Sequence, residues 1–500
     1  MLSLVRIFLL TRSVVSPIKL GHYAGLTQLV ECQLPKLNVA GSSPVLRSHL
    51  SVSYYPTRLL KSSRVTIMGK GTIKMTLRII ISVIFSLNLA CESNETSSML
   101  DRGGEMTGGE VMGGETTGGE MTSIALSEMT LWRSPIETYI DEATTAIGPE
   151  IDKGIHDLFV FNDRLYIGYG DADLNAGGVS PIQILSFNTP EGEVSAESLE
   201  TGEEGIYRYR LIDGELMIAG LDSTDADELT SRPLIEGNFL RTRNGVWEKY
   251  RAIQGGEHVH DVTRFMEGLW AVGSGADNRM EWETYGVYRY LWFSDDGGVT
   301  WRRYKRVFRE ESGDTRFINL LSVGPRLFIF GFLNPAEGPI VPKNEMILGA
   351  TGEPTPLATE EGDNEIHPFA NVYVESTYPI SEVLGIVSGF DLDERKWRVW
   401  QVMDGGQIEA LTAWGDRRLI DLSVNQQDNR LTLLFNDNNE GDASSGVIMH
   451  GQDIDHLTEL TLLSFDSTTR PLSISQWGEF IFMGRVDGQI WRGQLRLESK

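Results

Sequence analysis

Cysteine is almost absent from this 500-residue chain. Cys32 and Cys91 are its two cysteines, and no Cys-x-x-Cys spacing occurs. A disulfide framework, a zinc site built on thiolates and a dithiol active site are therefore excluded. Residues 126–500 contain no cysteine at all, so a thiol nucleophile is excluded from this large segment too.

Basic charge is also scarce, except near the N-terminus. The chain has 44 Lys and Arg residues against 70 Asp and Glu residues, a net charge of −26. Residues 1–90 hold eleven of the basic residues and a single acidic one, Glu31, so residues 91–500 carry 33 basic residues against 69 acidic ones. A body this acidic repels phosphate backbones, which argues against nucleic acid as a partner.

No apolar run is long enough to cross a bilayer as a helix. The stretch from Ile79 to Ala90 has twelve residues, follows Lys70, Lys74 and Arg78, and ends at Cys91. Basic residues, a short apolar run and a small residue before the break are the parts of a secretory signal. With a cysteine after Ala90, the segment resembles a bacterial lipoprotein signal, which implies that Cys91 is lipidated. We predict a signal peptide over 68–90, starting at Met68 or Met75, with ordinary export as the alternative.

The segments on either side of this signal are predicted to have no fold. Back-translation of residues 24–48 approaches a transfer-RNA gene, so we interpret residues 1–67 as a spurious or unstructured extension. Residues 91–125 contain a five-residue repeat that begins Gly103-Gly-Glu-Met-Thr. Without bulky apolar side chains, such a segment cannot offset the entropy of ordering. We expect a flexible linker with a reach of about 30–35 Å.

Sustained helical periodicity is missing from residues 126–500, where short alternating apolar runs are separated by Gly, Asn and Asp. One unit, a turn followed by an apolar strand, recurs at intervals of 47 to 58 residues. Its aligned apolar residues are Leu165, Leu216, Leu269, Leu327, Leu384, Leu431 and Phe480. Seven such units predict an all-β fold, a β-propeller of seven four-stranded blades over residues 126–500. Six blades are the alternative, because the fifth unit is the least regular.

Two further patterns concern the outer parts of the blades. A turn followed by Trp recurs, at Trp247, Trp301, Trp397 and Trp491, and is interpreted as a second repeated hairpin. The last unit is short after Trp491. We therefore predict that residues 130–142 supply the outer strand of the final blade, so that the ring closes without an open sheet edge.

Polar residues recur eight positions before the aligned apolar residue, near the expected start of each innermost strand. They are Asp157, Arg208, Asp261, Asn319 and Ser376, joined by Asp421 if two inserted residues are allowed; the residues just before them include His156, Tyr207, His260 and Glu375. One interpretation is a ligand-binding site at the channel mouth, with Asp157, Arg208, Asp261, Asn319, Asp421 and His260 as candidates. The other is that these side chains form hydrogen bonds between neighbouring blades. Strict alternation along a strand would prevent His156 and Asp157 from both facing the channel.

Metal and cofactor sites are not predicted. Asp171-Ala-Asp173-Leu-Asn175 begins like a calcium loop, but Ile182 stands where an EF-hand loop has its bidentate Glu. The segment is interpreted as a turn, as is the Asn- and Asp-rich segment 435–440.

The stretch Ser294-Asp295-Asp296-Gly297-Gly298-Val299-Thr300-Trp301 follows the pattern Ser-x-Asp-x-Gly-x-Thr-Trp. It resembles the Asp-box, or bacterial neuraminidase repeat, of sialidases and related β-propellers. The resemblance implies a structural turn formed by Ser294, Asp296, Gly298, Thr300 and Trp301. The family's early Phe/Tyr-Arg-Ile-Pro segment and its arginine triad have no match here, since the Arg-Pro pairs are Arg232-Pro233 and Arg470-Pro471. No catalytic residue is carried over, and serine-hydrolase, P-loop and zinc-protease motifs are also absent.

The sequence therefore predicts an exported β-propeller, anchored to the bacterial cell envelope through a lipid on Cys91, that binds a glycan, a peptide or another envelope protein without catalysis. Its location would be extracytoplasmic, at the outer membrane, the periplasm or the cell surface. The alternatives are a divergent glycoside hydrolase or lyase with its site at the channel mouth, and a scaffold component of an envelope assembly.

Overall fold

The computed structural model describes residues 123–136, 152–171, 182–221, 235–307, 313–335, 338–349, 352–357, 367–437 and 444–498, and two short strands before them. These two, Thr66–Ile67 (β1) and Met75–Thr76 (β2), pair with each other in antiparallel fashion. The expected signal peptide and most of the expected linker, including Cys91, lie outside the described residues. None of the helices in the described part of the chain is long and apolar enough to cross a membrane.

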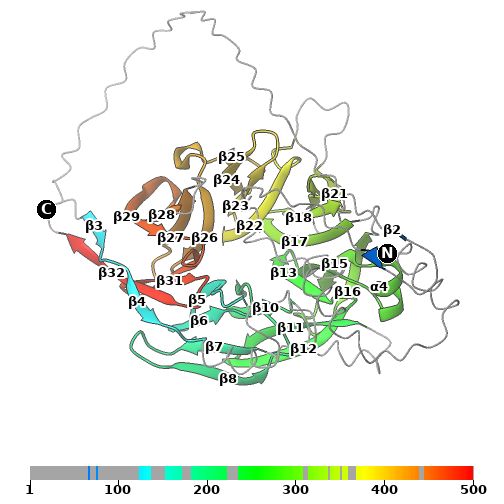
Figure 1. Cartoon of the computed structure of the whole chain (residues 1–500), viewed down its shortest axis with the longest axis horizontal. Coiled ribbons are helices and arrows are strands. Elements are labelled where there is room, and N and C mark those ends of the chain that lie inside the picture. The colour runs from blue at the N-terminus through cyan, green and yellow to red at the C-terminus, as the bar shows by residue number, and fades with distance from the viewer. Residues whose placement is uncertain are drawn as a thin grey trace, which may run out of the picture. The chain divides into compact units, whose positions relative to one another are not determined.

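Seven antiparallel sheets follow one another along the chain from Ser123 onward (Figure 1). The first blade consists, from the innermost strand outward, of β5 (Asp157–Phe161), β6 (Arg164–Gly168), β7 (Gln183–Phe187) and β8 (Val194–Glu200). The second consists of β9 (Arg210–Ile212), β10 (Glu215–Ala219), β11 (Glu236–Arg243) and β12 (Val246–Gln254). The third consists of β13 (His258–Phe265), β14 (Gly268–Gly275), β15 (Tyr288–Ser294) and β16 (Arg302–Val307).

The fourth blade has an extra short strand paired to its second one. It consists of β17 (Gly313–Val323), β18 (Arg326–Pro335), β19 (Val341–Pro342), β20 (Glu345–Leu348) and β21 (Thr355–Pro356), and the fifth blade of β22 (Val372–Ser381), β23 (Leu384–Asp391), β24 (Lys396–Met403) and β25 (Ile408–Ala410). The sixth consists of β26 (Arg418–Val424), β27 (Leu431–Asp437), β28 (Ser444–Gly451) and β29 (Leu457–Phe465). The seventh consists of β30 (Pro471–Trp477), β31 (Phe480–Arg485) and β32 (Ile490–Glu498) with β3 and β4.

The prediction of seven blades is confirmed, and the fifth unit forms a complete blade. All seven aligned apolar residues lie in the second strand of their blade. Two-residue turns join the first and second strands of most blades, as at Asn162-Asp163 and Asp213-Gly214, where all four residues have positive φ. Turns of this kind match the twist of a hairpin and favour Asn, Asp and Gly.

The last blade takes its outer strands from the beginning of the described chain. Ser123–Leu126 (β3) pairs with the end of β32, and Thr130–Arg133 (β4) pairs with its beginning. The prediction of an outer strand from residues 130–142 is therefore confirmed for 130–133. The pairing also begins at Ser123, three residues ahead of the expected domain boundary at 126; residues 137–142 lie outside the described part.

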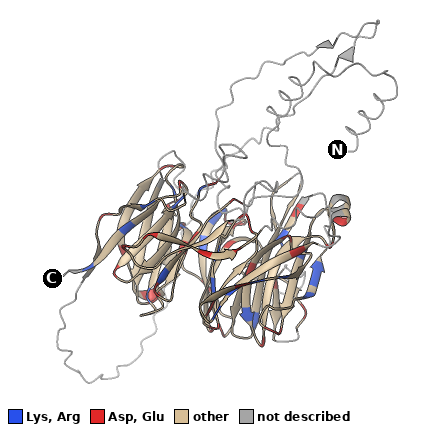
Figure 2. Cartoon of the chain, turned by 90° about the horizontal axis from the view of Figure 1, so that it is seen from below, with Lys and Arg blue, Asp and Glu red and all other residues tan. Residues whose placement is uncertain are grey.

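The hydrophobic core lies between neighbouring blades rather than in one central layer. One cluster, for example, combines Leu434 and Ile448 of the sixth blade with Ile474, Ile481 and Met483 of the seventh. Figure 2 shows basic and acidic positions interspersed along the strands, with most of the ribbon formed by other residues.

The four turns that precede Trp are not equivalent, contrary to the prediction of a second repeated hairpin. Trp247 and Trp301 follow turns between the third and fourth strands of their blades. Trp397 and Trp491 follow turns between the second and third strands. These two kinds of turn lie at opposite ends of a blade, because successive strands are antiparallel.

The two faces of the propeller therefore differ. One face, here called the short-turn face, has the two-residue turns between first and second strands. The opposite face, the long-loop face, is where each innermost strand begins, and it carries long connections such as 169–182, 220–235 and 276–287. The last of these contains the helix Arg279–Tyr285 (α4), which is capped by the Asn278 side chain.

Candidate ligand-binding site at the channel mouth

A β-bulge precedes the recurring polar position in four blades, and the seventh blade has a bulge at the equivalent place, before Ser473. The register shifts lie at Val259/Asp261, Phe317/Asn319, Val374/Ser376, Leu419/Asp421 and Pro471/Ser473. A bulge inserts one extra residue, so successive side chains no longer alternate strictly between two faces. The recurring polar residue and the residue before it therefore need not point to opposite faces of the strand.

Three aspartates at this position each join one blade to the next. Asp157 Oδ2 accepts a hydrogen bond from Tyr209 N at 2.6 Å, Asp261 Oδ2 from Leu320 N at 2.8 Å, and Asp421 Oδ2 from Ile474 N at 2.8 Å. All three carboxylates are buried, with at most 8% of the residue exposed. A buried carboxylate held by a backbone N–H serves to fix the blades against one another.

The remaining candidates reach further across the ring. Arg208 donates to Asn319 Oδ1 at 2.8 Å, which links the second blade to the fourth. Asn319 in turn donates to the Glu375 carbonyl of the fifth blade at 3.1 Å. Ser376 is buried. These hydrogen bonds agree with the second interpretation of the recurring position, in which its side chains join one blade to another.

Arg210, two residues beyond Arg208, crosses the interior of the ring. Its guanidinium forms two hydrogen bonds to Asp261 in the third blade, at 2.7 and 2.8 Å. It also donates to the carbonyl and the hydroxyl of Thr377 in the fifth blade, both at 3.1 Å. A buried ion pair thus links the second, third and fifth blades inside the ring.

A second recurring position, three residues before the first, holds an arginine in three blades. It is occupied by Arg316 in the fourth blade, Arg418 in the sixth and Arg470 in the seventh, with His258 in the third and Tyr373 in the fifth. Sequence reasoning missed these arginines because it followed only the first position and the residue before it. Aligning the inner strands three residues further back would have revealed them.

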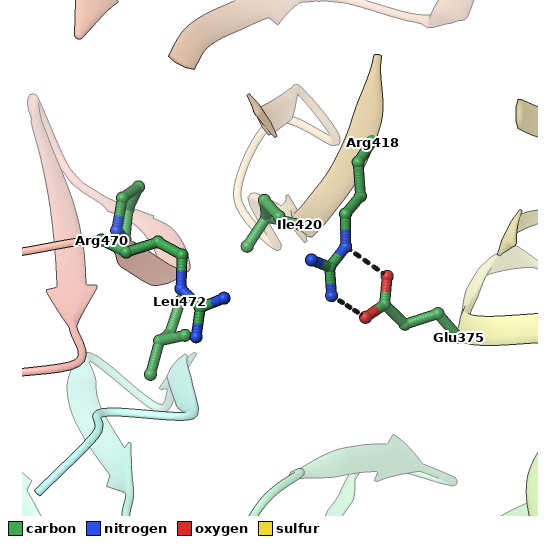
Figure 3. Close-up of a pocket in the computed structure, with 6 residues that line it drawn as sticks. Glu375, Arg418, Ile420, Arg470 and Leu472 are labelled. Carbon is green, nitrogen blue, oxygen red and sulfur yellow. Dashed lines mark hydrogen bonds and ion pairs between the residues drawn. The ribbon is translucent and has the colours of Figure 1, made fainter. Parts of the chain in front are cut away.

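A pocket lies between the inner strands of the fifth, sixth and seventh blades (Figure 3). Its lining residues are Glu375, Arg418, Ile420, Arg470, Pro471 and Leu472, around a cavity of about 10 Å³, which has room for about one water molecule. Glu375, Ile420 and Leu472 are the extra residues of their β-bulges. The bulges therefore turn these three side chains toward the mouth.

The two arginines of the pocket have different partners. Arg418 Nε donates to Glu375 Oε2 at 2.8 Å and its Nη2 binds the other carboxylate oxygen, so that the pair is bidentate. Arg418 also lies over the Trp397 ring, 4.6 Å from its centroid. Among the described residues none forms a hydrogen bond or ion pair with the Arg470 guanidinium, whose Nε is fully buried. Burial, and then the charge of Arg418, lowers the pKa of Arg470.

The local sequence holds Arg470 in place. Asp466 Oδ1 accepts hydrogen bonds from the backbone N–H of Thr468 and from the Thr469 hydroxyl, both at 2.9 Å, which closes the turn into β30. Pro471 follows, and a residue before proline is restricted to extended conformations. Arg470 is thus presented from a rigid turn.

Two histidine rings lie elsewhere on the inner strands. His258 and His260 are stacked, with ring centroids 6.1 Å apart. Burial, together with the charges of Arg316 and His258, holds the pKa of His260 well below its usual range. His260 is therefore neutral at physiological pH.

The turn from Ser294 to Trp301 lies on the short-turn face, far from the mouth. Gly298 N donates to Ser294 Oγ at 2.8 Å, and Asp296 accepts from both the backbone and the hydroxyl of Thr300, at 2.9 and 2.6 Å. Trp301 packs edge-on against Phe239 of the second blade, with centroids 5.4 Å apart. These residues hold a turn and join two blades.

Metal-binding geometry is not found in the part of the chain that the structure describes, where no three His, Cys, Asp or Glu side chains form a suitable group. Asp171 is buried, and its Oδ2 accepts a hydrogen bond from Asp152 N. Residues 172–181 and 438–440 lie outside the described part.

Comparison with known proteins adds no family. No protein-family model matches the chain, and no curated protein matches it in sequence. Among solved structures, it is similar to the β-propeller domain of the Trilobed protease from Pyrococcus furiosus, with 7% identity, 70% of this chain and 98% of that chain covered, and a TM-score of 0.41. It is also similar to Drosophila Semaphorin 1a, extracellular domains 1-2, with 8% identity, coverage of 69% and 86%, and a TM-score of 0.36. A putative TolB from Agrobacterium tumefaciens has 13% identity, coverage of 61% and 94%, and a TM-score of 0.31. No function is transferred from these proteins.

Proposed function

We propose that this protein is an exported β-propeller, held at the bacterial cell envelope by a lipid on Cys91, that binds a soluble ligand at the channel mouth without catalysis. The observation that carries the proposal is the pocket on the long-loop face, lined by Arg418 and Arg470.

The N-terminal strand shows where a preceding linker would join the propeller. Ser123 pairs with Glu498, four residues beyond Gln494, which pairs with Phe480 at the short-turn end of β31. A linker that precedes Ser123 therefore joins the propeller at its short-turn face.

The engagement of the recurring aspartates also supports a binding role. A glycosidase needs two carboxylates free to act as acid and as nucleophile or base. Asp157, Asp261 and Asp421 are instead held by backbone N–H groups of the next blade. The Ser294–Trp301 turn supports kinship with Asp-box propellers at the level of the fold alone.

Lipid attachment can be tested on the full chain in a bacterial host grown with an alkyne analogue of palmitate. We expect the protein to be labelled and found with membranes. Cys91→Ala should abolish the label, while Ser93→Ala, a change two residues further along the expected mature chain, should keep it. Labelling that survives Cys91→Ala would overturn the anchoring part of the proposal.

Binding can be tested by a thermal-shift screen of neutral and acidic sugars, amino acids and peptides, followed by hydrogen exchange with each compound that raises the Tm. We expect protection of backbone amides in the β26 and β30 inner strands near the mouth. Protection confined to the short-turn face would contradict the site. Turnover of chromogenic glycosides would replace the binding role with the hydrolase alternative.

A further inference from the structure

We propose that two copies of this protein associate through β29, the outermost strand of the sixth blade, which pairs in antiparallel fashion with β29 of a second copy around Leu462. The two four-stranded sheets then become one sheet of eight strands. The proposal goes beyond the proposed function, because it concerns the outer rim of the propeller and does not depend on the channel mouth or on the lipid anchor.

The first step is that β29 has an open edge. It is the last strand of its sheet and pairs on one side with β28, and Figure 1 shows it at the outer side of its blade. Within the described part of the chain, no backbone hydrogen bond joins its other side to any residue. Such an edge presents N–H and C=O groups with which a further strand can pair.

The second step is that the other outermost strands carry protection that β29 lacks. β8, β12 and β16 have two, three and four charged side chains, and β21 and β25 have only two and three residues. β3 and β4 have four residues each. β29 has nine residues and one charged side chain, Glu459, which lies 3.7 Å from Arg417. Charged side chains and short length are what keep an edge from pairing, so β29 is the outer strand best suited to a partner.

The third step is an exposed leucine in the middle of this edge. Leu462 pairs across the strands with Val447, which packs in a cluster with Val399 and Trp414 of the fifth blade. Cross-strand partners share a face, so Leu462 lies on the side of the fifth blade. Because that blade ends in the three-residue β25, Leu462 stays 66% exposed. A partner strand would cover it.

The fourth step identifies the partner as a second copy. If two β29 strands pair around Leu462, the two Leu462 side chains lie opposite each other at the two-fold axis. Thr461 then lies opposite Leu463 of the second copy, and Glu459 lies opposite Phe465 of the second copy. No like charges face each other along the strand, although the chain has a net charge of −26. A two-fold dimer requires a surface that matches itself in this way.

The test is sedimentation velocity of the full chain with Cys91→Ala, which removes the expected lipid site, in a reducing buffer so that Cys32 cannot cross-link copies. We expect the average mass to rise toward that of two chains as the protein concentration is raised. Leu462→Lys brings two like charges together at the axis and should raise the dissociation constant about tenfold or more. The matched control is Leu131→Lys on β4, where Leu131 is 53% exposed; this variant should associate like the unsubstituted chain.

A charge swap tests the register of the two strands. Leu462→Glu alone should also lose association. An equal mixture of Leu462→Lys and Leu462→Glu should regain it, because opposite charges then meet at the axis. Both variants should melt at the temperature of the Leu131→Lys control, since Leu462 is exposed in the single chain. If Leu462→Lys fails to fold, Ser464→Lys, which is also exposed on β29, replaces it in the titration.

Three results would overturn the proposal. The first is a chain that keeps the mass of one copy at every concentration. The second is equal association of Leu462→Lys and Leu131→Lys, which would place the contact elsewhere on the molecule. The third is loss of association in both charge variants without recovery in their mixture, which would exclude antiparallel pairing around Leu462.

Discussion

The Asp157 carboxylate of the first blade accepts a hydrogen bond from the Tyr209 backbone N–H of the second blade, across 2.6 Å. The same relationship joins Asp261 to Leu320 and Asp421 to Ile474. In each case the acceptor side chain stands at the recurring position and the donor lies one residue past that position in the next blade. Ring closure in this propeller thus depends on a repeated polar contact as well as on apolar packing.

Removing one of these carboxylates should destabilise the ring. Asp157→Ala and Asp421→Ala each leave a buried backbone N–H without its acceptor, so we expect each to lower the free energy of unfolding by roughly 1–3 kcal/mol. The two carboxylates bond to backbone groups of different blades, so the double variant should be additive within about 0.5 kcal/mol. Urea unfolding measures both effects.

The control for this pair is Asp455→Ala. Asp455 is exposed, and a surface substitution of this kind should change stability by less than about 0.5 kcal/mol. Equal stability of Asp157→Ala and Asp455→Ala would mean that the bond between the blades contributes nothing measurable.

The N-terminal strands should be required for a closed ring. Trp132 in β4 packs against Phe187 of the first blade and Phe482 of the last, with ring centroids 4.5 and 4.7 Å away, and its Nε1 donates to the Pro190 carbonyl at 3.0 Å. Protein that begins at Asp152 loses these contacts and exposes the edge of β32. We expect it to melt well below protein that begins at Thr122.

A point substitution tests the same contact without truncation. Trp132→Ala should cost roughly 3–5 kcal/mol, as for other large aromatic residues in a core. Leu131, its neighbour in β4, is 53% exposed, so Leu131→Ala should cost less than about 0.5 kcal/mol. Similar melting of the two variants would contradict a closing role for β4.

Much of this fold could be predicted from the sequence, because each blade repeats one local pattern. The residues from Leu165 to Phe480 mark the second strands, since a tight turn and an apolar run are set by neighbouring residues alone. The turns before Trp247 and Trp397 look alike in sequence, yet they lie at opposite ends of their blades. Which two strands a turn joins depends on how many strands of the blade come before it, and a five-residue pattern does not contain that number.

The site was predicted less completely, for a physical reason. The recurring aspartates were found, but they were interpreted with strict alternation along a strand, the rule applied to His156 and Asp157. A β-bulge between Val259 and Asp261, repeated in four other blades, relaxes that rule. Arg418 and Arg470, the arginines that line the pocket, each lie just before the bulge of their own blade. They are separated by 52 residues in sequence, so only the assembled ring brings them together.

Acid should weaken the fold through His367. This ring lies beside Phe328 and Phe369, and its Nδ1 accepts a hydrogen bond from Phe369 N at 3.2 Å. Burial lowers its pKa to about 4, below the value of about 6.5 for an unfolded chain. The unfolded state therefore binds the proton first as pH falls. The stability from neutral His367 is complete above pH 6.5 and is lost between pH 6.5 and 4.

The effect is measured by urea unfolding at pH 7 and pH 4.5. We expect His367→Phe to lose less stability between these pH values than wild type, by roughly 1–2 kcal/mol after discounting for partial exposure. His456, whose side chain is 76% exposed, provides the control. If His456→Gln and His367→Phe change the pH dependence equally, burial of His367 is not the cause.

Gly298 should be far less replaceable than Gly245, although both are glycines with positive φ in turns of the short-turn face. Their φ angles are 90° and 76°. A Cβ on Gly298 would lie 2.2 Å from a ring carbon of Phe239, whereas nothing lies within 4 Å of a Cβ on Gly245. Gly245→Ala therefore carries only the strain of its backbone, about 1 kcal/mol. Gly298→Ala carries a comparable strain and must also displace Phe239 from its edge-on contact with Trp301, which adds roughly 1–3 kcal/mol. Thermal melting of the two variants measures the difference. A crystal structure of Gly298→Ala with Phe239 unmoved and a Tm equal to that of Gly245→Ala would contradict the role of this turn in joining the second and third blades.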